Sequence, residues 1–161
     1  MIRSIAMAAG LAGAVALSQF PEFSQQYLQR LSGAVHELEV IVFAVDATAA
    51  GAGLSREEAL AELSDTEFRS GLRDTLAERI ARYERLHADY EALKGTAPLA
   101  RLAQPWRFGD ADLLGRTWAT YRPAVPVTAD GLLAAGIGFA AGWTPTMGLF
   151  GGLRRLLRRR A

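Results

Sequence analysis

Two long stretches of the chain contain no charged residue, and they lie at opposite ends of a sequence that is otherwise rich in charge. The first covers residues 4–21 and the second covers residues 131–153. As helices they would measure about 27 Å and about 35 Å at a rise of about 1.5 Å per residue. The hydrocarbon core of a bilayer is about 30 Å thick. The sequence therefore predicts a transmembrane helix near each end of the chain.

The composition agrees with this uneven distribution. Of the 161 residues, 50% are hydrophobic and 22% are charged, yet the formal net charge is only +1. Residues 22–130 hold all 17 acidic residues but only 12 of the 18 basic ones, so this middle region has a net charge of −5. The uneven placement of the apolar residues argues against both a uniform soluble globule and a disordered chain. The absence of cysteine excludes disulfides, thiolate metal sites and thiol nucleophiles.

The first apolar stretch allows two interpretations. Arg3, an apolar run and then Ala14-Val15-Ala16 form the pattern of a cleavable secretory signal, which would remove residues 1–16. The run continues beyond that point to Phe20, however, as a retained transmembrane helix or signal anchor over residues 4–21 would. Both interpretations place the segment that follows outside the cytoplasm.

The arginines predict the orientation. Arg3 precedes the first apolar stretch, and five arginines follow the second: Arg154, Arg155, Arg158, Arg159 and Arg160. Because positive residues near membrane spans stay on the cytoplasmic side, both termini are expected in the cytoplasm. In a bacterium, residues 22–130 would then be periplasmic and the protein would sit in the inner membrane. We interpret the basic tail, residues 154–161, as a topology anchor that contacts anionic lipids rather than nucleic acid.

The region 22–94 is predicted to form an antiparallel, coiled-coil-like helical hairpin from helices at 22–48, 55–63 and 66–94. Apolar residues recur every three or four positions in both long segments, which is typical of amphipathic helices. Along the first they are Phe23, Tyr27, Leu31, Val35, Leu38, Val42 and Val45; along the last they are Phe68, Leu72, Leu76, Ile80, Tyr83, Leu86, Tyr90 and Leu93. The two long helices are nearly equal in length, so one would leave the membrane and the other return to it.

Residues 95–130 differ, because prolines interrupt them and aromatic residues are frequent. We predict a membrane-proximal collar with one short helix over residues 111–121, which Asp110 would cap. Aromatic rings are favoured at the membrane–water interface, and the candidates for that position are Phe20, Phe23, Trp106, Phe108, Trp118 and Tyr121. In the alternative, the collar is a soluble subdomain that buries the same rings against the hairpin.

Small residues four positions apart in both apolar stretches predict close helix packing. They are Ala9, Gly13, Gly138, Gly142, Gly148 and Gly152. The simpler interpretation is that the two spans pack on each other, and the alternative is an interface between copies of the chain. Pro145 interrupts the second stretch, where the hydroxyls of Thr144 and Thr146 can bond freed carbonyl groups.

No constellation typical of catalysis is found. A joint metal site of His36 and His87 with Glu37, Glu39 or Glu84 is conceivable, but no HExxH or comparable spacing is present and exposed helical histidines are far commoner. The paired carboxylates Glu57/Glu58 and Asp110/Asp112 stand at helix starts, where they favour the helix dipole. No phosphate loop, nucleophile elbow or dinucleotide fingerprint is present. We expect no catalytic residue, no cofactor and no metal, and therefore no enzyme.

Three segments resemble a known family. They are LSQFPEFSQQYLQRLSGA at 17–34, PW at 105–106 and RPAVPVTADG at 122–131, the last followed by a glycine-rich span with GW at 142–143. These segments are similar to a proteobacterial family catalogued only as a domain of unknown function. The resemblance implies an all-α protein of the Gram-negative inner membrane with a periplasmic helical region, and it implies no catalytic or binding residue.

These observations favour a non-catalytic scaffold, assembly factor or accessory subunit that acts through the periplasmic hairpin. Its partners would be the lipid bilayer and either another protein or further copies of the chain. One alternative is a small oligomeric channel or transport component. The other is a module that binds lipid or envelope material through its aromatic collar.

Overall fold

The computed structural model describes residues 2–125 and 127–160, with side chains for residues 3–125 and 127–150. The described chain consists of helices and loops and contains no strand, which confirms the all-α prediction. The elements are α1 (Ile2–Ser18), α2 (Phe20–Gly51), α3 (Arg56–Ala61), α4 (Glu67–Lys94), the 3-10 helices η1 (Leu99–Ala103) and η2 (Pro105–Phe108), α5 (Ala111–Thr120) and α6 (Ala129–Arg160).

The chain divides into two compact units, which we describe separately. The terminal unit comprises the described residues of 1–26, 97–105 and 117–161. The central unit comprises residues 27–96 and 106–116. The boundaries between the units fall within α2, η2 and α5 and, between residues 96 and 97, in the loop that joins α4 to η1.

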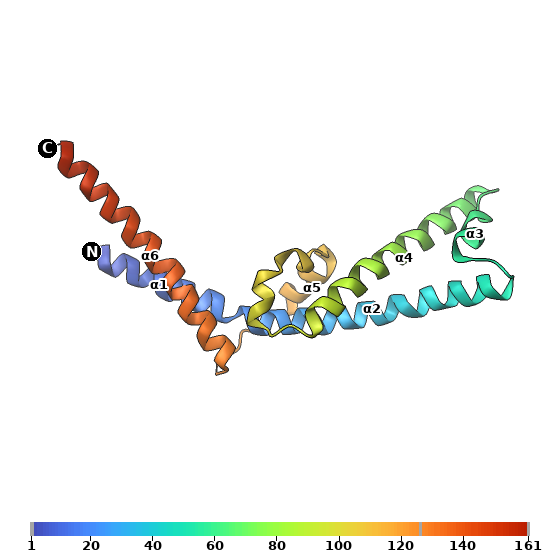
Figure 1. The fold of residues 1–161 in the computed structure, drawn as a ribbon, viewed down its shortest axis with the longest axis horizontal. Helices are drawn as coiled ribbons and strands as arrows, with labels where there is room; N and C mark the ends of the chain where they lie inside the picture. Colours follow the sequence, from blue (N-terminus) through green and yellow to red (C-terminus); the bar gives the residue numbers. More distant parts are fainter. Residues whose placement is uncertain (1, 126, 161) are drawn as a thin grey trace. The chain divides into compact units, whose positions relative to one another are not determined.

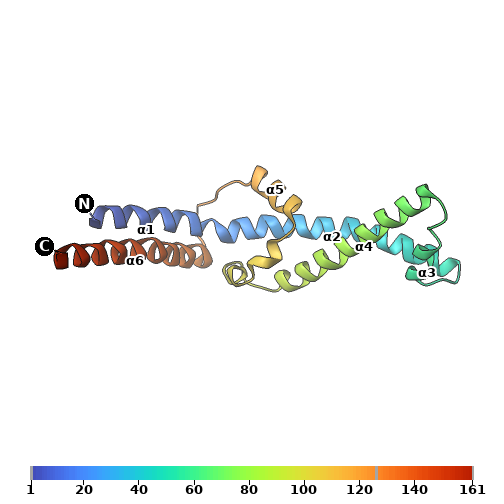
Figure 2. The same ribbon diagram turned by 90° about the horizontal axis from the view of Figure 1, so that it is seen from above.

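Within the terminal unit, α1 and α6 lie side by side and run in opposite directions (Figures 1 and 2). The start of α1 and the end of α6 therefore lie at the same end of the pair. Helix α6 is longer than the predicted span 131–153 because it continues to Arg160 through the predicted basic tail. Leucine and arginine are both strong helix formers, which accounts for the extension.

Two helical stretches are long and apolar enough to cross a membrane. One lies within Arg3–Gly51 and the other is Ala129–Phe150. Only 22% and 11% of their apolar windows are buried, whereas the core helix of a water-soluble protein is mostly buried. The first stretch lies near the N-terminus, where a signal sequence passes the same test.

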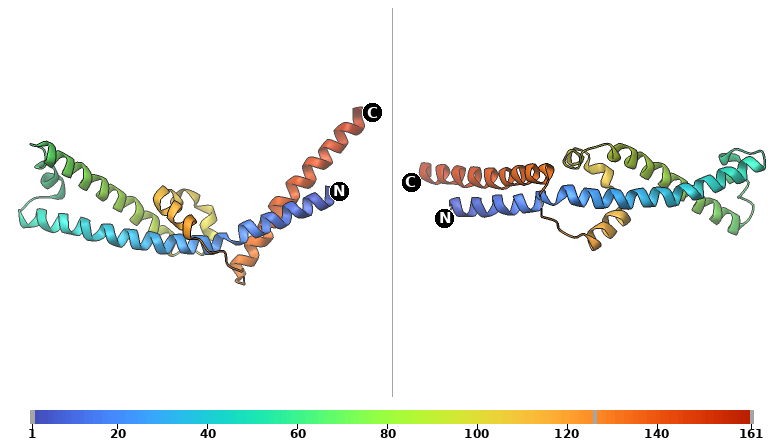
Figure 3. Two further views of the ribbon diagram at one scale, coloured as in Figure 1. Left: turned by 180° about the vertical axis from the view of Figure 1, so that it is seen from behind. Right: turned by 90° about the horizontal axis from the view of Figure 1, so that it is seen from below.

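In the central unit, α2 and α4 run in opposite directions and α3 lies between their distal ends (Figures 1 and 3). Local sequence explains these ends. Gly53 adopts a φ of 74°, a left-handed conformation that glycine takes without strain, just after α2 ends. Ser55 and Glu58 form a complete capping box at the start of α3. The hydroxyl of Thr66 caps α4 by accepting a hydrogen bond from the Arg69 N–H.

One apolar cluster joins the elements of the central unit. The stripe predicted along residues 22–48 supplies half of its buried residues, namely Tyr27, Leu31, Val35 and Leu38. The cluster is completed by Leu28 of α2, Leu86 and Leu93 of α4, and Leu113 of α5. Burying such side chains stabilises the unit by about 1.5–3 kcal/mol each.

The apolar stripe predicted along α4 is only partly buried. Ile80, Leu86 and Leu93 are buried, but Phe68 is 80% exposed and Leu72 is 40% exposed. The cause is geometric, since α4 diverges from α2 toward the end that α3 occupies (Figure 1). The periodicity of the sequence identified the apolar face of α4. It did not show along what length of that face α2 would pack.

Candidate functional site

The closest helix contact of the terminal unit is made by glycines. Gly13 of α1 faces Gly138 of α6, and a Cβ atom added to either residue would overlap the carbonyl oxygen of the other. Gly142 likewise faces Ala9, and a Cβ there would overlap the Ala9 carbonyl oxygen and lie 3.1 Å from the Gly10 Cα. Small residues at four-residue spacing let the two backbones touch, as in membrane helix pairs.

The structure thus brings four of the predicted packing residues together within a single chain. Gly148 is not part of this contact, because a Cβ atom added there would meet nothing within 4 Å. Gly152 lies outside the residues whose side chains are described, and so do Arg154, Arg155, Arg158, Arg159 and Arg160. Helix α6 continues through Pro145, and the hydroxyls of Thr144 and Thr146 donate to the carbonyl oxygens of Ala140 (2.7 Å) and Gly142 (2.8 Å).

A cleft of about 670 Å³ lies beside this helix contact, entirely within the terminal unit. Its lining combines small residues of α1 and α6 with aromatic residues of α2 and α5 and the following loop: Gly13, Ala16, Leu17, Gln19, Phe20, Phe23, Trp118, Tyr121, Gly138, Ala141 and Gly142. Ligand pockets usually have volumes of about 300–1,000 Å³. The cleft therefore has the size of a binding site.

Gln19, the one residue between α1 and α2, ties the loop after α5 to this cleft. Its side-chain amide donates to the Ala124 carbonyl oxygen (3.1 Å) and accepts from the Ala124 N–H (3.1 Å). It also accepts a hydrogen bond from the Tyr121 hydroxyl at 2.9 Å. The partners are more than 100 residues apart, so no sequence pattern indicated this role.

The predicted interface aromatics fall into two groups. Phe20, Phe23, Trp118 and Tyr121 line the cleft, where the Phe23 ring makes edge contacts with Trp118 (6.1 Å between centroids) and Tyr121 (5.6 Å). In the central unit Phe108 packs against Tyr27, with centroids 4.7 Å apart. The contact of Phe108 with Tyr27 is of the kind that the alternative interpretation of the collar predicts.

The most exposed of the predicted aromatics are two tryptophans. Trp106 is 67% exposed and Trp118 is 73% exposed. Tryptophan has an apolar ring and one polar N–H, which suits it to a surface that is partly apolar and partly wet. Both rings are therefore available to a membrane surface or to a partner.

A buried arginine of the terminal unit was not identified from the sequence. Arg101 in η1 is 3% exposed and donates to the Ser24 hydroxyl (3.2 Å) and the Gln25 amide oxygen (3.1 Å). Burial lowers the pKa of its guanidinium below the ordinary value. Its neighbours in sequence give no signal of burial, because its polar partners lie in a distant segment.

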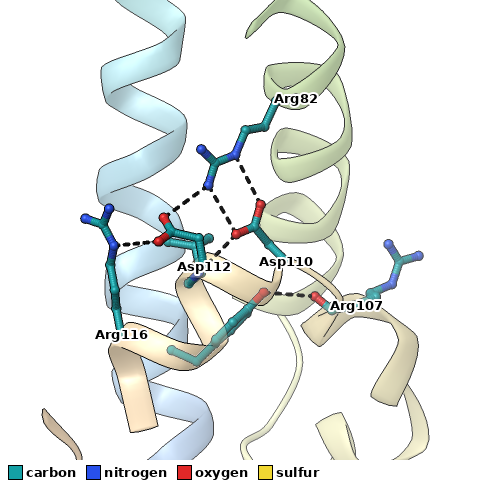
Figure 4. A network of polar contacts seen from close by, with 7 residues as sticks. Arg82, Arg107, Asp110, Asp112 and Arg116 are labelled. Carbon is teal, nitrogen blue, oxygen red and sulfur yellow. Dashed lines mark hydrogen bonds and ion pairs between the residues drawn. The ribbon is translucent and has the colours of Figure 1, made fainter. Parts of the chain in front are cut away.

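A polar network in the central unit fastens α5 to α4 (Figure 4). Arg82 of α4 donates to both carboxylate oxygens of Asp110, each at 3.1 Å, and lies 3.6 Å from Asp112. Asp110 also caps α5, as predicted, by accepting a hydrogen bond from the Leu113 N–H at 3.0 Å. Asp112 accepts from Arg116 at 2.8 Å. The carboxylates predicted as caps therefore also form ion pairs between helices.

Hydrogen bonds decide the charge state of Asp110. Burial alone would raise the pKa of its carboxyl, but the Leu113 N–H and the Arg82 guanidinium hold that pKa below its ordinary value. The same pairing raises the pKa of Arg82. Both groups are thus charged near neutral pH, and the arrangement stabilises structure instead of preparing a carboxyl for proton transfer.

The network continues at the base of the hairpin through a second ion pair. Arg107 of η2 donates to the Asp89 carboxylate at 3.1 Å. The backbone carbonyl oxygen of Arg107 accepts a hydrogen bond from the Tyr27 hydroxyl at 3.5 Å (Figure 4). Within the central unit, Arg107 is therefore bonded to both α4 and α2.

The two histidines lie in different surroundings. His36 is exposed and lies 3.6 Å from Glu39, and His87 packs against the Tyr83 ring with centroids 5.4 Å apart. In the part of the chain that the structure describes, no group of three or more potential ligands is arranged to hold a metal ion.

A second cleft, of about 720 Å³, lies at the distal end of the central unit between α2, α3 and the start of α4. Its lining is mainly aliphatic and includes Val45, Leu60, Leu63 and Leu76. Phe43 and Phe68, which are 73% and 80% exposed, belong to the same end of the unit. We call this end, with its cleft and the two phenylalanines, the tip.

The geometry defines an all-helical protein with a glycine-packed pair of apolar terminal helices and a charged helical region between them in sequence. The chain belongs to the family described as Protein of unknown function (DUF2937), whose model matches residues 1–159. This confirms the resemblance to a family of unknown function. The comparisons with curated proteins and with solved structures give no match.

Proposed function

We propose that the protein is a non-catalytic scaffold or accessory subunit of the bacterial inner membrane. Helices α1 and α6 anchor it, and the central unit presents a surface to a partner protein. The observation that carries the proposal is the antiparallel α1–α6 pair, which is closed by glycines on one side and covered with exposed apolar side chains elsewhere.

The exposed surface of the pair supports a membrane environment. The exposed large apolar side chains of the pair are Ile5, Met7, Leu11, Val15, Leu132, Leu133, Ile137, Trp143 and Leu149. Contiguous apolar patches of this kind are rare on soluble monomers. In a bilayer the same residues face lipid, and the helical backbone satisfies its own polar groups.

The contact of α1 with α6 also favours a retained anchor over a cleaved signal. Loss of residues 1–16 would remove Ala9 and Gly13, against which Gly142 and Gly138 pack. The positive-inside rule then supports cytoplasmic termini and a periplasmic central unit, because Arg3 and the C-terminal arginines flank the pair.

The tip supports a protein partner. It combines two exposed phenylalanines with a mainly aliphatic cleft, and aromatic residues beside apolar pockets dominate protein interfaces. The charged groups of the central unit support a non-catalytic role, since Arg82, Asp110, Asp112 and Arg116 neutralise one another.

Replacing both Phe43 and Phe68 by serine is expected to release the partner. Loss of an interface aromatic costs about 2 kcal/mol or more, which is about a thirtyfold loss of affinity. The full-length protein is solubilised in mild detergent, and co-purifying proteins are quantified for the wild type and the variant.

Trp106→Ser is the matched control, because Trp106 is similarly exposed in the same unit but lies away from the tip. It should retain the partner. A wild-type protein that purifies alone as a monomer, or equal loss in both variants, contradicts the proposed role of the tip.

A further inference from the structure

The glycines that close the α1–α6 pair also shape the floor of the cleft beside it. Gly13, Gly138 and Gly142 all belong to the cleft lining and to the helix contact. Because no side chains project from the glycines where α1 and α6 touch, an open space remains beside the contact. Ala16 and Ala141 border this space and are themselves exposed, so the space above the floor is not filled by the chain's own side chains.

The lining of the cleft is almost entirely hydrocarbon. Gln19 is the one residue in it with a side-chain amide, and that amide is bonded to Tyr121 and Ala124. The Tyr121 hydroxyl in turn donates to Gln19. A bound water needs two to four polar partners. The described lining therefore favours an apolar occupant over water.

Which apolar molecule occupies the cleft depends on the medium around α1 and α6. This step rests on the anchoring role proposed above. An open apolar cleft within a bilayer does not stay empty, because its lining would lose dispersion contacts. The molecules at hand there are lipid chains. We propose that the cleft between α1 and α6 binds one acyl chain of a membrane phospholipid.

The aromatic wall of the cleft fits the course of such a lipid. Trp118 and Tyr121 line the cleft together with Phe23, whereas Gly138 and Gly142 line it within the apolar part of α6. Tryptophan and tyrosine prefer the headgroup level of a bilayer. If the headgroup of a phospholipid lies near Trp118, its acyl chain runs along α6 toward the contact between Gly13 and Gly138.

The experiment uses the full-length protein and a photoactivatable lipid. The protein is reconstituted in vesicles of phosphatidylethanolamine and phosphatidylglycerol that contain some phosphatidylcholine with a diazirine in one acyl chain. It is then extracted and exchanged exhaustively into a maltoside detergent, which replaces lipid on open surfaces. After irradiation, mass spectrometry counts the labels per chain and locates them.

The wild type is expected to carry no more than one lipid label per chain, located on residues that line the cleft. Ala16→Leu and Ala141→Leu fill the cleft and should each lower labelling about tenfold, the change that corresponds to about 1.4 kcal/mol. Ala12→Leu and Ala140→Leu are matched controls on the same helices, exposed and outside the cleft, and should keep the label. Circular dichroism checks that all four variants retain wild-type helix content.

Three results would overturn the inference. They are the absence of label in the wild type, equal labelling of cleft and control variants, and labels spread evenly around α1 and α6. A crosslink between two chains through the cleft residues would assign the cleft to a second copy, which also overturns it. If the protein fails to enter the vesicles at all, the anchoring proposal itself fails, so the two failures are distinguishable.

Discussion

Replacing Gly138 by isoleucine is expected to separate α1 from α6. A Cβ atom at position 138 would overlap the Gly13 carbonyl oxygen and lie 2.8 Å from the Leu17 Cβ, and isoleucine adds further atoms beyond it. Overpacking of this kind costs about 1–3 kcal/mol even where the surroundings relax. Here much of the obstruction is backbone, which cannot rotate away, so we expect the upper part of this range.

The measurement uses the absence of cysteine in the chain. Dyes on Ser4→Cys and Leu149→Cys, both exposed positions at the same end of the pair, report its closure by energy transfer in detergent. The concentration of a denaturing detergent at which half of the pairs have separated should be much lower for Gly138→Ile than for the wild type. Gly136→Ile is the control, because a Cβ atom at Gly136 meets nothing within 4 Å. Equal concentrations for the two variants would show that this contact does not hold the pair together.

Replacing Asp110 by alanine is expected to detach α5 from α4 in the central unit. The change removes the cap on the Leu113 N–H and leaves Arg82, a partly buried cation, without its bidentate partner. A lost cap costs about 0.5–2 kcal/mol. With the loss of the ion pair, we expect about 2–3 kcal/mol in total. Thermal unfolding of the full-length protein, followed by circular dichroism, measures the change.

Asp74→Ala is the control for that measurement. Asp74 pairs with its neighbour Arg73 at the surface, where such pairs contribute about 0–1 kcal/mol. Its removal should leave the unfolding temperature nearly unchanged. A loss for Asp74→Ala as large as that for Asp110→Ala would mean that the network of Figure 4 has no special role.

The pH dependence separates the charge of Asp110 from its capping role. The pKa of Asp110 is lower in the folded protein than its ordinary value of about 3.9. Its contribution to stability is therefore present above about pH 4 and is lost as the pH falls through the lowered folded pKa. Asp110→Asn keeps a capping side chain but loses this pH-dependent contribution. A variant whose acid unfolding profile equals that of the wild type contradicts the assignment.

The sequence predicted the features that depend on neighbouring residues. The glycine and alanine spacing in α1 and α6 identified Ala9, Gly13, Gly138 and Gly142, because residues four apart share one face of a helix. Asp110 was predicted as a cap, since its position before an apolar helix carries that signal. The apolar stripes likewise identified Tyr27, Leu31, Leu86 and Leu93 as parts of the core.

Features that join distant segments were not predicted. The bond from Arg82 to Asp110 joins residues 28 apart, and Gln19 meets Tyr121 across 102 residues. No local pattern specifies such pairs. The divergence of α4 from α2 was also missed, because the apolar period continues through Phe68 and Leu72 although no helix covers them. The length of a helix and the spacing of its apolar residues define its apolar face, whereas tertiary packing determines which part of that face is buried.

The central claim is that α1 and α6 cross one membrane and that the central unit lies on the side opposite to both termini. The most direct measurement is labelling of single cysteines in cells with a permeabilised outer membrane, by a maleimide that cannot cross the inner membrane. One cysteine replaces the exposed Ser64 near the tip, and another is added after Ala161. We predict that Ser64→Cys reacts at once and that the C-terminal cysteine reacts only after the inner membrane is lysed. Equal labelling of both before lysis, or protection of Ser64→Cys alone, would contradict the account.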